Sequence, residues 1–327
     1  MNIIAIKCFN FFNKRLSIGI KTLKILMYII LNIHFHYVVA EIYLLSNNNN
    51  ILGENLRYTI PNNNSHSLEY FAKKFKVGLR NLLAANPDID LYLPDSGKPI
   101  LIPKKLILPN TPHKGIIINI AEMRLYYYPN TKNNNIVMVF PISIGTPTHE
   151  TPSQWITSIK DKKKDPIWIP TQNIRNEYIK RAEILPLMIL SGPNNPLGSY
   201  ALYLGNSYAI HGSNTNLGIG LRVTRGCIRL RTEDIKLLYT LVPLNTRVQF
   251  INEPIKIAID SNGMQYLEIH TPLSTINNKQ DNKTATIHNL KIRTYTMLQK
   301  NNFKNINFLK VNQALEECLG IPIEITT

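Results

Sequence analysis

Two short stretches of this chain carry the groups that a thiol nucleophile requires. Residues 211–213 (HGS) end an apolar run, and residues 224–230 are TRGCIRL. A thiol attacks a carbonyl when a base takes its proton and backbone N–H groups receive the developing oxyanion. We therefore predict Cys227 as the nucleophile and His211 as its base. The peptide N–H groups around Gly226 and Cys227 are the predicted oxyanion donors.

Two arginines, Arg225 and Arg229, flank the predicted nucleophile. A nearby cation lowers a thiol pKa from its unperturbed value of about 8.5, and a guanidinium binds carboxylates through paired hydrogen bonds. We expect both effects here. The alternative is that Cys227 is an inert core residue, as cysteines among apolar neighbours usually are. Glycines in the surrounding residues argue against a core strand: Gly212, Gly218, Gly220 and Gly226.

Residues 211–214 (HGSN) and 219–230 (IGLRVTRGCIRL) resemble the active-site signature of L,D-transpeptidases with a YkuD-type catalytic domain. The likeness is strongest to the periplasmic ErfK/YbiS/YcfS/YnhG group, and residues 190–198 (LSGPNNPLG) resemble a further segment of that family. Three positions depart from the family pattern: Thr224 stands where Ser is usual, Arg225 where His is common, and Asn194 where Asp is usual. Threonine keeps the hydroxyl, and the first histidine of the signature is the family's base.

The resemblance implies a mainly β fold, a YkuD-type β-sandwich or open barrel with short helices. It also implies a substrate, the tetrapeptide stem of peptidoglycan, cut before its terminal D-alanine to leave a thioester on Cys227. An amine then accepts the acyl group, either diaminopimelate of a neighbouring stem in a 3→3 cross-link or the lysine of a wall-anchored lipoprotein. The Gly212 carbonyl is expected to orient the imidazole. The candidate substrate-binding residues are Arg225, Arg229, Thr224, Ser213 and Asn214.

Two alternatives to a transpeptidase remain open from the sequence. With water as the acceptor, the same thioester makes the protein an L,D-carboxypeptidase. A wall-binding scaffold whose catalytic domain has decayed is the other alternative. Transfer to an amine and hydrolysis both proceed without a metal or a cofactor, and we expect none. The histidines outside the motif, among them His149 and His270, lack the spacing of metal ligands.

The composition limits the classes of partner. The 327 residues include 37 Lys and Arg against 21 Asp and Glu, a formal net charge of +16, with 44% hydrophobic and 18% charged residues. This is enough apolar material for packed cores. The basic residues are scattered, without an aromatic-interleaved patch or a helix-turn-helix pattern, so nucleic acid is not the expected partner. An anionic cell-wall polymer suits the charge equally well.

The first forty residues have the pattern of an export signal. They contain five basic residues and no acidic one, and residues 25–40 are mostly apolar and end in Val-Val-Ala. We expect a periplasmic protein with this segment removed, the alternative being an uncleaved inner-membrane anchor. Only Cys227 and Cys318 then remain, and we expect no disulfide between them because it would block the nucleophile.

The rest of the chain predicts three parts. Residues 41–104 have a β-α-α-β order similar to a LysM module, which implies docking on peptidoglycan glycan; a cap without a ligand is the alternative. Residues 105–114 carry two prolines, with a third just before them at 103, and predict a stiff linker. Residues 115–251 are the expected catalytic domain, and 252–327 an α/β C-terminal extension.

Local patterns predict the following elements of the last two parts: a hairpin at 115–128, a strand at 136–144, a polar loop at 145–164, a helix at 173–183, strands at 201–204 and 207–210, a helix capped by Thr232, a strand at 245–250 that closes the sheet, a strand at 266–270, a polar break at 277–283, and helices within 285–300 and 307–319.

Overall fold

The computed structural model describes residues 40–46, 50–130, 135–215, 217–273 and 283–327. The expected leader at 1–40 and the expected polar break at 277–283 thus lie, but for their last residues, outside the described residues. Among the helices that the structure describes, none is long and apolar enough to cross a membrane.

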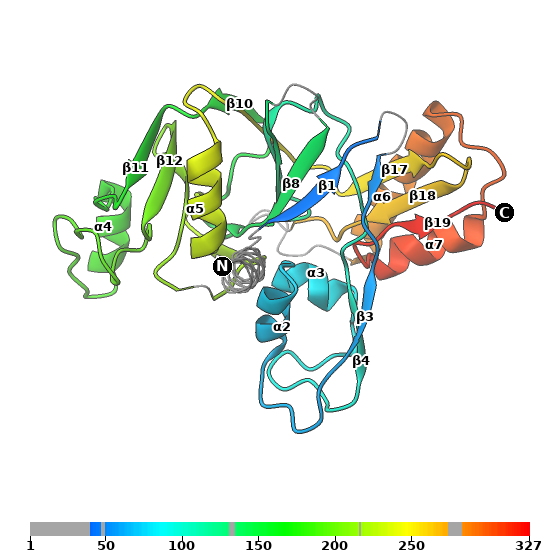
Figure 1. The fold of residues 1–327 in the computed structure, drawn as a ribbon, viewed down its shortest axis with the longest axis horizontal. Helices are drawn as coiled ribbons and strands as arrows, with labels where there is room; N and C mark the ends of the chain where they lie inside the picture. The colour runs from blue at the N-terminus through cyan, green and yellow to red at the C-terminus, as the bar shows by residue number, and fades with distance from the viewer. Residues whose placement is uncertain (1–39, 47–49, 131–134, 216, 274–282) are drawn as a thin grey trace, which may run out of the picture. The chain divides into compact units, whose positions relative to one another are not determined.

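The largest sheet has six strands and is antiparallel except between β6 and β16. Its first strand, β1, follows the expected leader and was predicted to belong to the N-terminal module, yet it pairs with β8. The strand order, shown in part in Figure 1, is β1 (Glu41–Leu44), β8 (Ile136–Pro141), β7 (Arg124–Tyr128), β6 (Gly115–Asn119), β16 (Arg247–Ile251) and β10 (Trp155–Ser158).

A second sheet of four strands carries His211 and lies next to Cys227, which immediately precedes one of its strands. Its order is β11 (Asp161–Lys164), β12 (Tyr200–Gly205), β13 (Tyr208–His211) and β15 (Ile228–Arg229), and β13 runs parallel to β15. A short parallel pair lies beside it, formed by β9 (Ile144–Gly145) and β14 (Arg222–Thr224). The fold is mainly β with few short helices, as predicted.

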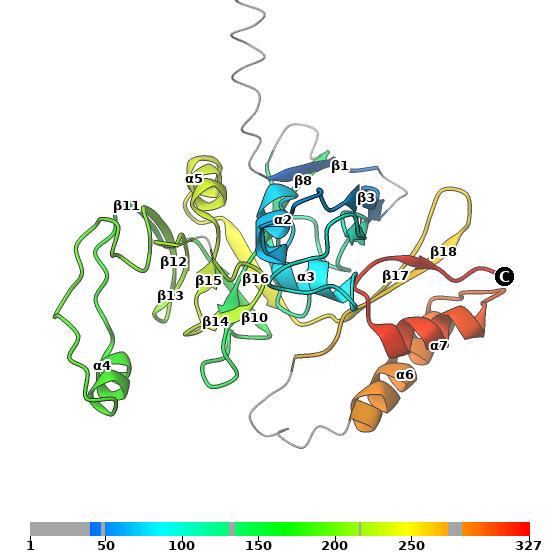
Figure 2. The same cartoon turned by 90° about the horizontal axis from the view of Figure 1, so that it is seen from below.

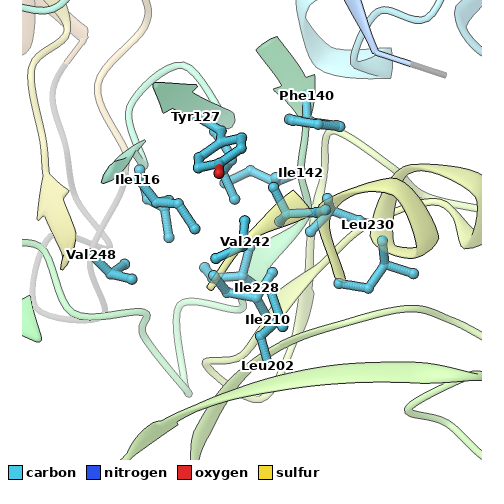
Figure 3. Close-up of a cluster of buried hydrophobic side chains, with 14 of the residues drawn as sticks. Ile116, Tyr127, Phe140, Ile142, Leu202, Ile210, Ile228, Leu230, Val242 and Val248 are labelled. Atoms are coloured by element: carbon cyan, nitrogen blue, oxygen red, sulfur yellow. The ribbon is translucent and has the colours of Figure 1, made fainter. Parts of the chain in front are cut away.

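Apolar side chains from both sheets form one core (Figure 3). Ile210 and Ile228, which are paired across β13 and β15, are both fully buried in it. Helix α5 (Thr232–Leu241) adds Ile235 and Leu238 to this cluster. The Tyr127 hydroxyl, 3.0 Å from the Leu241 carbonyl, ties the larger sheet to the end of this helix. Burial of Ile210 and Ile228 therefore holds the two strands that precede and follow the predicted active-site loop.

The β-α-α-β unit predicted near the N-terminus is present. It consists of β3 (Leu56–Thr59), α2 (Leu68–Lys74), α3 (Leu79–Ala84) and β4 (Pro99–Ile102). β3 and β4 pair antiparallel, and the helices pack on them around a separate apolar core. We refer to residues 56–102 as the N-terminal module.

The segment predicted as a linker is packed against the rest of the chain. Its β5 (Leu106–Ile107) pairs with β2 (Ile51–Leu52), and residues 106–109 are buried. The prediction followed the prolines, but Leu106 and Leu108, which precede the two prolines of the segment, enter a core shared with Ile117 and Tyr126 of the large sheet. Prolines next to a buried strand gave the appearance of an exposed connection.

The C-terminal extension is α/β. A sheet of β17 (Ile255–Ile259), β18 (Gln265–Ile269) and β19 (Ile323–Glu324) packs against α6 (Lys283–Lys300) and α7 (Phe308–Glu317). Figures 1 and 2 show the two helices lying together beside this sheet. Cys318 caps α7, and its thiol donates to the Leu315 carbonyl at 3.3 Å, so Cys318 and Cys227 are not joined in a disulfide.

A buried cluster of charges joins this extension to the large sheet. Arg124 Nη1 lies 2.9 Å from Glu122 and 3.0 Å from Glu268, and Lys256 Nζ lies 2.7 Å and 3.0 Å from the same two carboxylates. His270 Nε2 is 2.7 Å from Glu268. The Ile107 amide also donates to Glu268 at 2.6 Å, which fixes β5 to the same group. Two anions are thus neutralised by two cations away from water.

Burial by itself would raise the pKa of Glu268, but Lys256, His270 and Arg124 hold that pKa well below its usual range. A carboxyl with a depressed pKa stabilises the fold above its ordinary pKa of about 4.3, and this stabilisation is lost as the pH falls through the folded-state value.

Three local predictions were wrong. The loop expected at 145–164 contains β10 and β11, which the periodicity missed because β11 is the exposed sequence DKKK at a sheet edge. The strand expected to close the sheet, β16, lies inside it between β6 and β10. Helix α5 begins after Arg231, without a side-chain cap, and the Thr232 hydroxyl is instead directed to the Ser213 carbonyl at 3.4 Å.

Replacing Glu268 by alanine should lower the free energy of unfolding by about 3–5 kcal/mol, because Arg124 and Lys256 would be left buried beside a single carboxylate. Urea unfolding of the mature chain followed by circular dichroism measures this. Glu316→Ala, on the exposed face of α7, is the control and should stay within about 0.5 kcal/mol of the wild type. Equal effects of the two substitutions would contradict a stabilising role for the cluster.

Candidate functional site

Strand register places His211 and Cys227 on one face of the second sheet. Ile210 pairs with Ile228 and both point into the core, so their neighbours His211 and Cys227 project from the opposite face. Cys227 immediately precedes β15 and lies beside Ala209, two residues before His211 on β13. His211 is buried, and Cys227 is half-buried with its thiol 3.7 Å from the Ser207 carbonyl. The prediction that His211 is the base of Cys227 requires the two side chains to lie on one face, as this register places them.

The imidazole of His211 is oriented by backbone. Its Nδ1 lies 2.6 Å from the carbonyl of Gly212, which requires the proton on Nδ1 and leaves Nε2 as the acceptor. Burial lowers the pKa of His211 to about 4; Arg229 lowers it further, and the Gly212 carbonyl opposes the shift. The ring is therefore uncharged at neutral pH.

The pKa of the Cys227 thiol does not follow the sequence prediction. Burial raises this pKa, and a backbone hydrogen bond from Ala209 opposes the shift only in part. We had expected Arg225 and Arg229 to lower it, but neither guanidinium is the cause of a shift at the sulfur. At neutral pH the thiol and the imidazole are accordingly both uncharged.

The backbone around Gly226 is held by two threonines. The Gly226 N–H donates to Thr224 Oγ1 at 3.2 Å, and Thr224 Oγ1 donates to the Cys227 carbonyl at 2.6 Å. The Gly226 carbonyl accepts from Thr151 Oγ1 at 2.9 Å. Gly226 has φ +99°, and a Cβ there would lie 3.0 Å from the Tyr208 ring. Thr224, predicted to touch substrate, is buried and shapes the nucleophile loop.

Arg225 is engaged by a distant segment. The 35 residues from 165 to 199 connect β11 to β12, and α4 (Gln172–Ile179) lies within them (Figure 2); we call this stretch the α4 segment. Glu177 of α4 accepts a short hydrogen bond from Arg225 Nη1, and His149 Nε2 lies 2.6 Å from its other oxygen. The Arg225 guanidinium also lies over the Tyr178 ring, 5.7 Å from its centroid.

These contacts lower the pKa of Glu177 to about 2, through hydrogen bonds from Arg225 and then His149. The carboxylate is charged over the whole physiological range. It occupies the guanidinium that the sequence assigned to a substrate carboxylate, and it fastens the α4 segment to the loop that carries Cys227. Sequence patterns could not reveal Glu177 or His149, because each lies far from the motif along the chain.

Arg229 retains hydrogen-bonding capacity. Its Nη2 donates to the Leu217 carbonyl at 2.8 Å, while its buried Nε has no hydrogen-bond partner among the described residues. Ser213 is buried and its Oγ accepts from the Thr215 amide at 3.1 Å, so it shapes the backbone after the histidine. Asn214 is exposed. Of the predicted substrate-binding set, Arg229 and Asn214 thus present polar groups that are not fully used within the chain.

Asn195 organises the base of the α4 segment, a role the sequence did not indicate. Its fully buried amide donates to the Pro166 carbonyl at 2.7 Å, and its Oδ1 accepts from the Leu197 amide at 2.9 Å. Gly198 follows at φ +67°, and a Cβ there would lie 2.7 Å from the Ser213 amide. The PNNPLG stretch is therefore packed directly against the HGS stretch, whereas Asn194 is exposed.

Within the described part of the chain, one group of side chains has the spacing of a metal site. Ligand atoms of Glu122, Glu268 and His270 lie within 4.8 Å of one another. Arg124 and Lys256 already occupy the same carboxylates, so a cation would be repelled by two buried positive charges. These residues do not suit a metal ion.

Glu177→Ala should loosen the α4 segment, because Arg225 and His149 lose their shared partner. Limited trypsin digestion, followed by mass spectrometry, should then show cleavage after Lys180 and Arg181 several times faster than in the wild type. Glu183→Ala, at an exposed position of the same segment, is the control and should leave the rate unchanged. Wild-type cleavage rates in Glu177→Ala would show that this carboxylate does not fasten the segment.

Comparison with known proteins agrees with the geometry. Residues 113–250 match the L,D-transpeptidase catalytic domain, YkuD, and residues 254–325 match the L,D-transpeptidase C-terminal domain. The N-terminal module is matched by neither.

Curated relatives cover most of the chain. The probable L,D-transpeptidase ErfK/SrfK of Salmonella typhimurium is 43% identical over 294 residues, which is 89% of this chain and 93% of the relative. The probable L,D-transpeptidase YbiS of Escherichia coli is 44% identical over 275 residues, 84% of this chain and 88% of the relative. YcfS of Escherichia coli, also named a probable L,D-transpeptidase, is 45% identical over 228 residues, 68% of this chain and 70% of the relative. The chain is therefore an enzyme of the L,D-transpeptidase family, with a YkuD catalytic domain followed by the C-terminal domain of that family.

Proposed function

We propose that this protein is a periplasmic L,D-transpeptidase of peptidoglycan in which Cys227 and His211 carry out acyl transfer. The observation that supports it most is the shared face of β13 and β15, from which both side chains project, with Nδ1 of the imidazole held by the Gly212 carbonyl. Nε2 is then left to accept the thiol proton. Members of this family act on peptidoglycan stem peptides, and a tetrapeptide stem is the donor we propose.

The acylation step begins with transfer of the Cys227 proton to His211 Nε2. The thiolate attacks the carbonyl carbon that precedes the terminal D-alanine, and a tetrahedral oxyanion forms. Its collapse breaks the peptide bond, and the leaving amine takes the proton from His211. D-Alanine departs, and the rest of the stem remains as a thioester on Cys227. The proton count balances because His211 returns to its neutral form.

Deacylation follows the reverse order with an incoming amine. His211 takes a proton from the amine, the nitrogen attacks the thioester, and the Cys227 thiol leaves with that proton. Diaminopimelate of a second stem gives a 3→3 cross-link, and the lysine of a wall-anchored lipoprotein gives an attached protein. Release of the thioester to water would give a tripeptide instead.

The Cys227 N–H is our principal candidate for the oxyanion donor, because the Gly226 N–H already donates to Thr224 Oγ1. Such a backbone donor contributes about 3–4 kcal/mol to the transition state in other enzymes. Arg229 is the candidate for a stem carboxylate, since the side chain is only half-buried and its Nη2 donates to the Leu217 carbonyl in the loop that follows His211. Arg225 can take this role only by releasing Glu177. We also propose that the N-terminal module, similar in order to LysM, binds wall glycan.

Incubation of the mature chain with a disaccharide-tetrapeptide should give a dimer of the mass of two substrates minus one D-alanine. Cys227→Ala should abolish the dimer, because no thioester can form. Binding to isolated sacculi should stay intact, because we assign that binding to the N-terminal module and not to the thiol. Cys318→Ala is the matched control and should retain product. A tripeptide without dimer would establish a carboxypeptidase, and sacculus binding without any product would establish a scaffold. Product from Cys227→Ala would remove that residue from its role.

The pH profile of kcat/KM should have an acid limb near pH 4 rather than near pH 6.5, because the base is the neutral imidazole and burial lowers the pKa of His211 to about 4. Activity should therefore change little between pH 7 and pH 5.5. Circular dichroism at each pH separates this limb from unfolding, since the buried Glu268 cluster also weakens in acid. An acid limb centred near pH 6.5 in folded protein would contradict a buried neutral base.

A further inference from the structure

The N-terminal module reaches the loop between the two catalytic strands. This connecting loop, residues 212–215 and 217–221 in the described chain, follows His211 and precedes β14. Glu69, on the first turn of α2, accepts a short hydrogen bond from the Gly218 amide, although the two residues are 149 positions apart. The Leu79 amide, at the start of α3, donates to the Ile219 carbonyl at 3.0 Å. Both contacts link the module to backbone of the loop.

The backbone of the connecting loop lies directly against the backbone of the N-terminal module, with no room for a side chain between them. Gly220 has φ +93°, and a Cβ there would lie 2.5 Å from the Leu79 amide nitrogen and 2.6 Å from Gly78 Cα. Leu221, the next residue, packs on the apolar core of the module. Arg231, beyond β15, donates from Nη2 to the Val77 carbonyl at 2.8 Å. The module is therefore built against the catalytic domain here, and not merely tethered to it.

The same loop holds the guanidinium of Arg229. Arg229 Nη2 donates to the carbonyl of Leu217, the residue directly before Gly218. The Gly218 carbonyl accepts from Ser143 Oγ at 2.8 Å, so residue Gly218 is held at its carbonyl by the catalytic domain and at its N–H by Glu69. Burial lowers the pKa of Arg229, and the Glu69 carboxylate opposes that shift because the two opposite charges attract each other. Arg229 is thus fixed through the loop by a carboxylate of the other module.

We infer that Glu69 is a positioning residue of the transpeptidase: through Gly218 and Leu217 it holds Arg229 where a stem carboxylate binds. The N-terminal module then has a second role, as one support of the substrate site, in addition to any contact with the wall. This inference rests on the proposed function, because it assigns Arg229 to the donor stem. It does not require the module to bind glycan.

The test uses the mature full-length chain and the soluble disaccharide-tetrapeptide, for which anchoring to the wall is irrelevant. Glu69→Ala should raise KM about tenfold, the loss expected for one hydrogen bond to a charged group, and leave kcat within about twofold. Glu69→Gln should restore most of the affinity, because its amide oxygen still accepts from Gly218. Glu54→Ala, at an exposed position just before the module, is the control and should match the wild type in both constants.

Hydrogen exchange reads the same contact without any turnover. Peptides covering the connecting loop should exchange at least several times faster in Glu69→Ala than in Glu54→Ala, with the protection of α5 unchanged. Wild-type KM together with unchanged loop exchange in Glu69→Ala would overturn the inference, as would a loss confined to kcat. Absence of product from the wild type would overturn the proposed function instead, and loop exchange would still decide whether Glu69 positions the loop.

Discussion

The parallel pairing of β13 with β15 is the constraint on which the proposed catalytic geometry depends. Ile210 and Ile228 meet across this pair and are buried in the core, which turns His211 and Cys227 toward the opposite face. A shift of one residue in register would exchange the two faces and place the imidazole in the core. The packing of Ile210 and Ile228 in the core therefore also decides which face His211 and Cys227 occupy.

The surroundings of these strands are supplied by parts of the chain that are remote in sequence. The α4 segment is fastened to the nucleophile loop by Glu177, the N-terminal module reaches the connecting loop with Glu69, and the buried charges around Glu268 bind the C-terminal extension and β5 to the large sheet. Each of these contacts uses a charged group, and the charges around Glu268 are fully buried. Such groups are costly to leave unpaired, so they make the arrangement specific.

Sequence patterns predicted the local elements well where periodicity was strong, as in the 115–128 hairpin, the β-α-α-β unit and the two C-terminal helices. They failed where an element is polar or where an apolar stretch is broken by prolines. The polar strand β11 was taken for a loop and the buried strand β5 for a linker, because neither alternates between core and solvent. β1 was assigned to the wrong part because strand partners are not encoded in a strand's own composition.

The residue types and their spacing by themselves determined the family and the candidate residues: a histidine, a cysteine that follows a glycine, and two arginines. Tertiary structure alone decided what state those groups are in. Burial, and not the neighbouring arginines, governs the pKa of the Cys227 thiol. Arg225 is taken by Glu177, 48 positions away, and Arg229 is held by way of Glu69. The reason is physical: the pKa of a group and the availability of a guanidinium depend on everything that folding brings within a few ångströms, and most of that lies far along the chain.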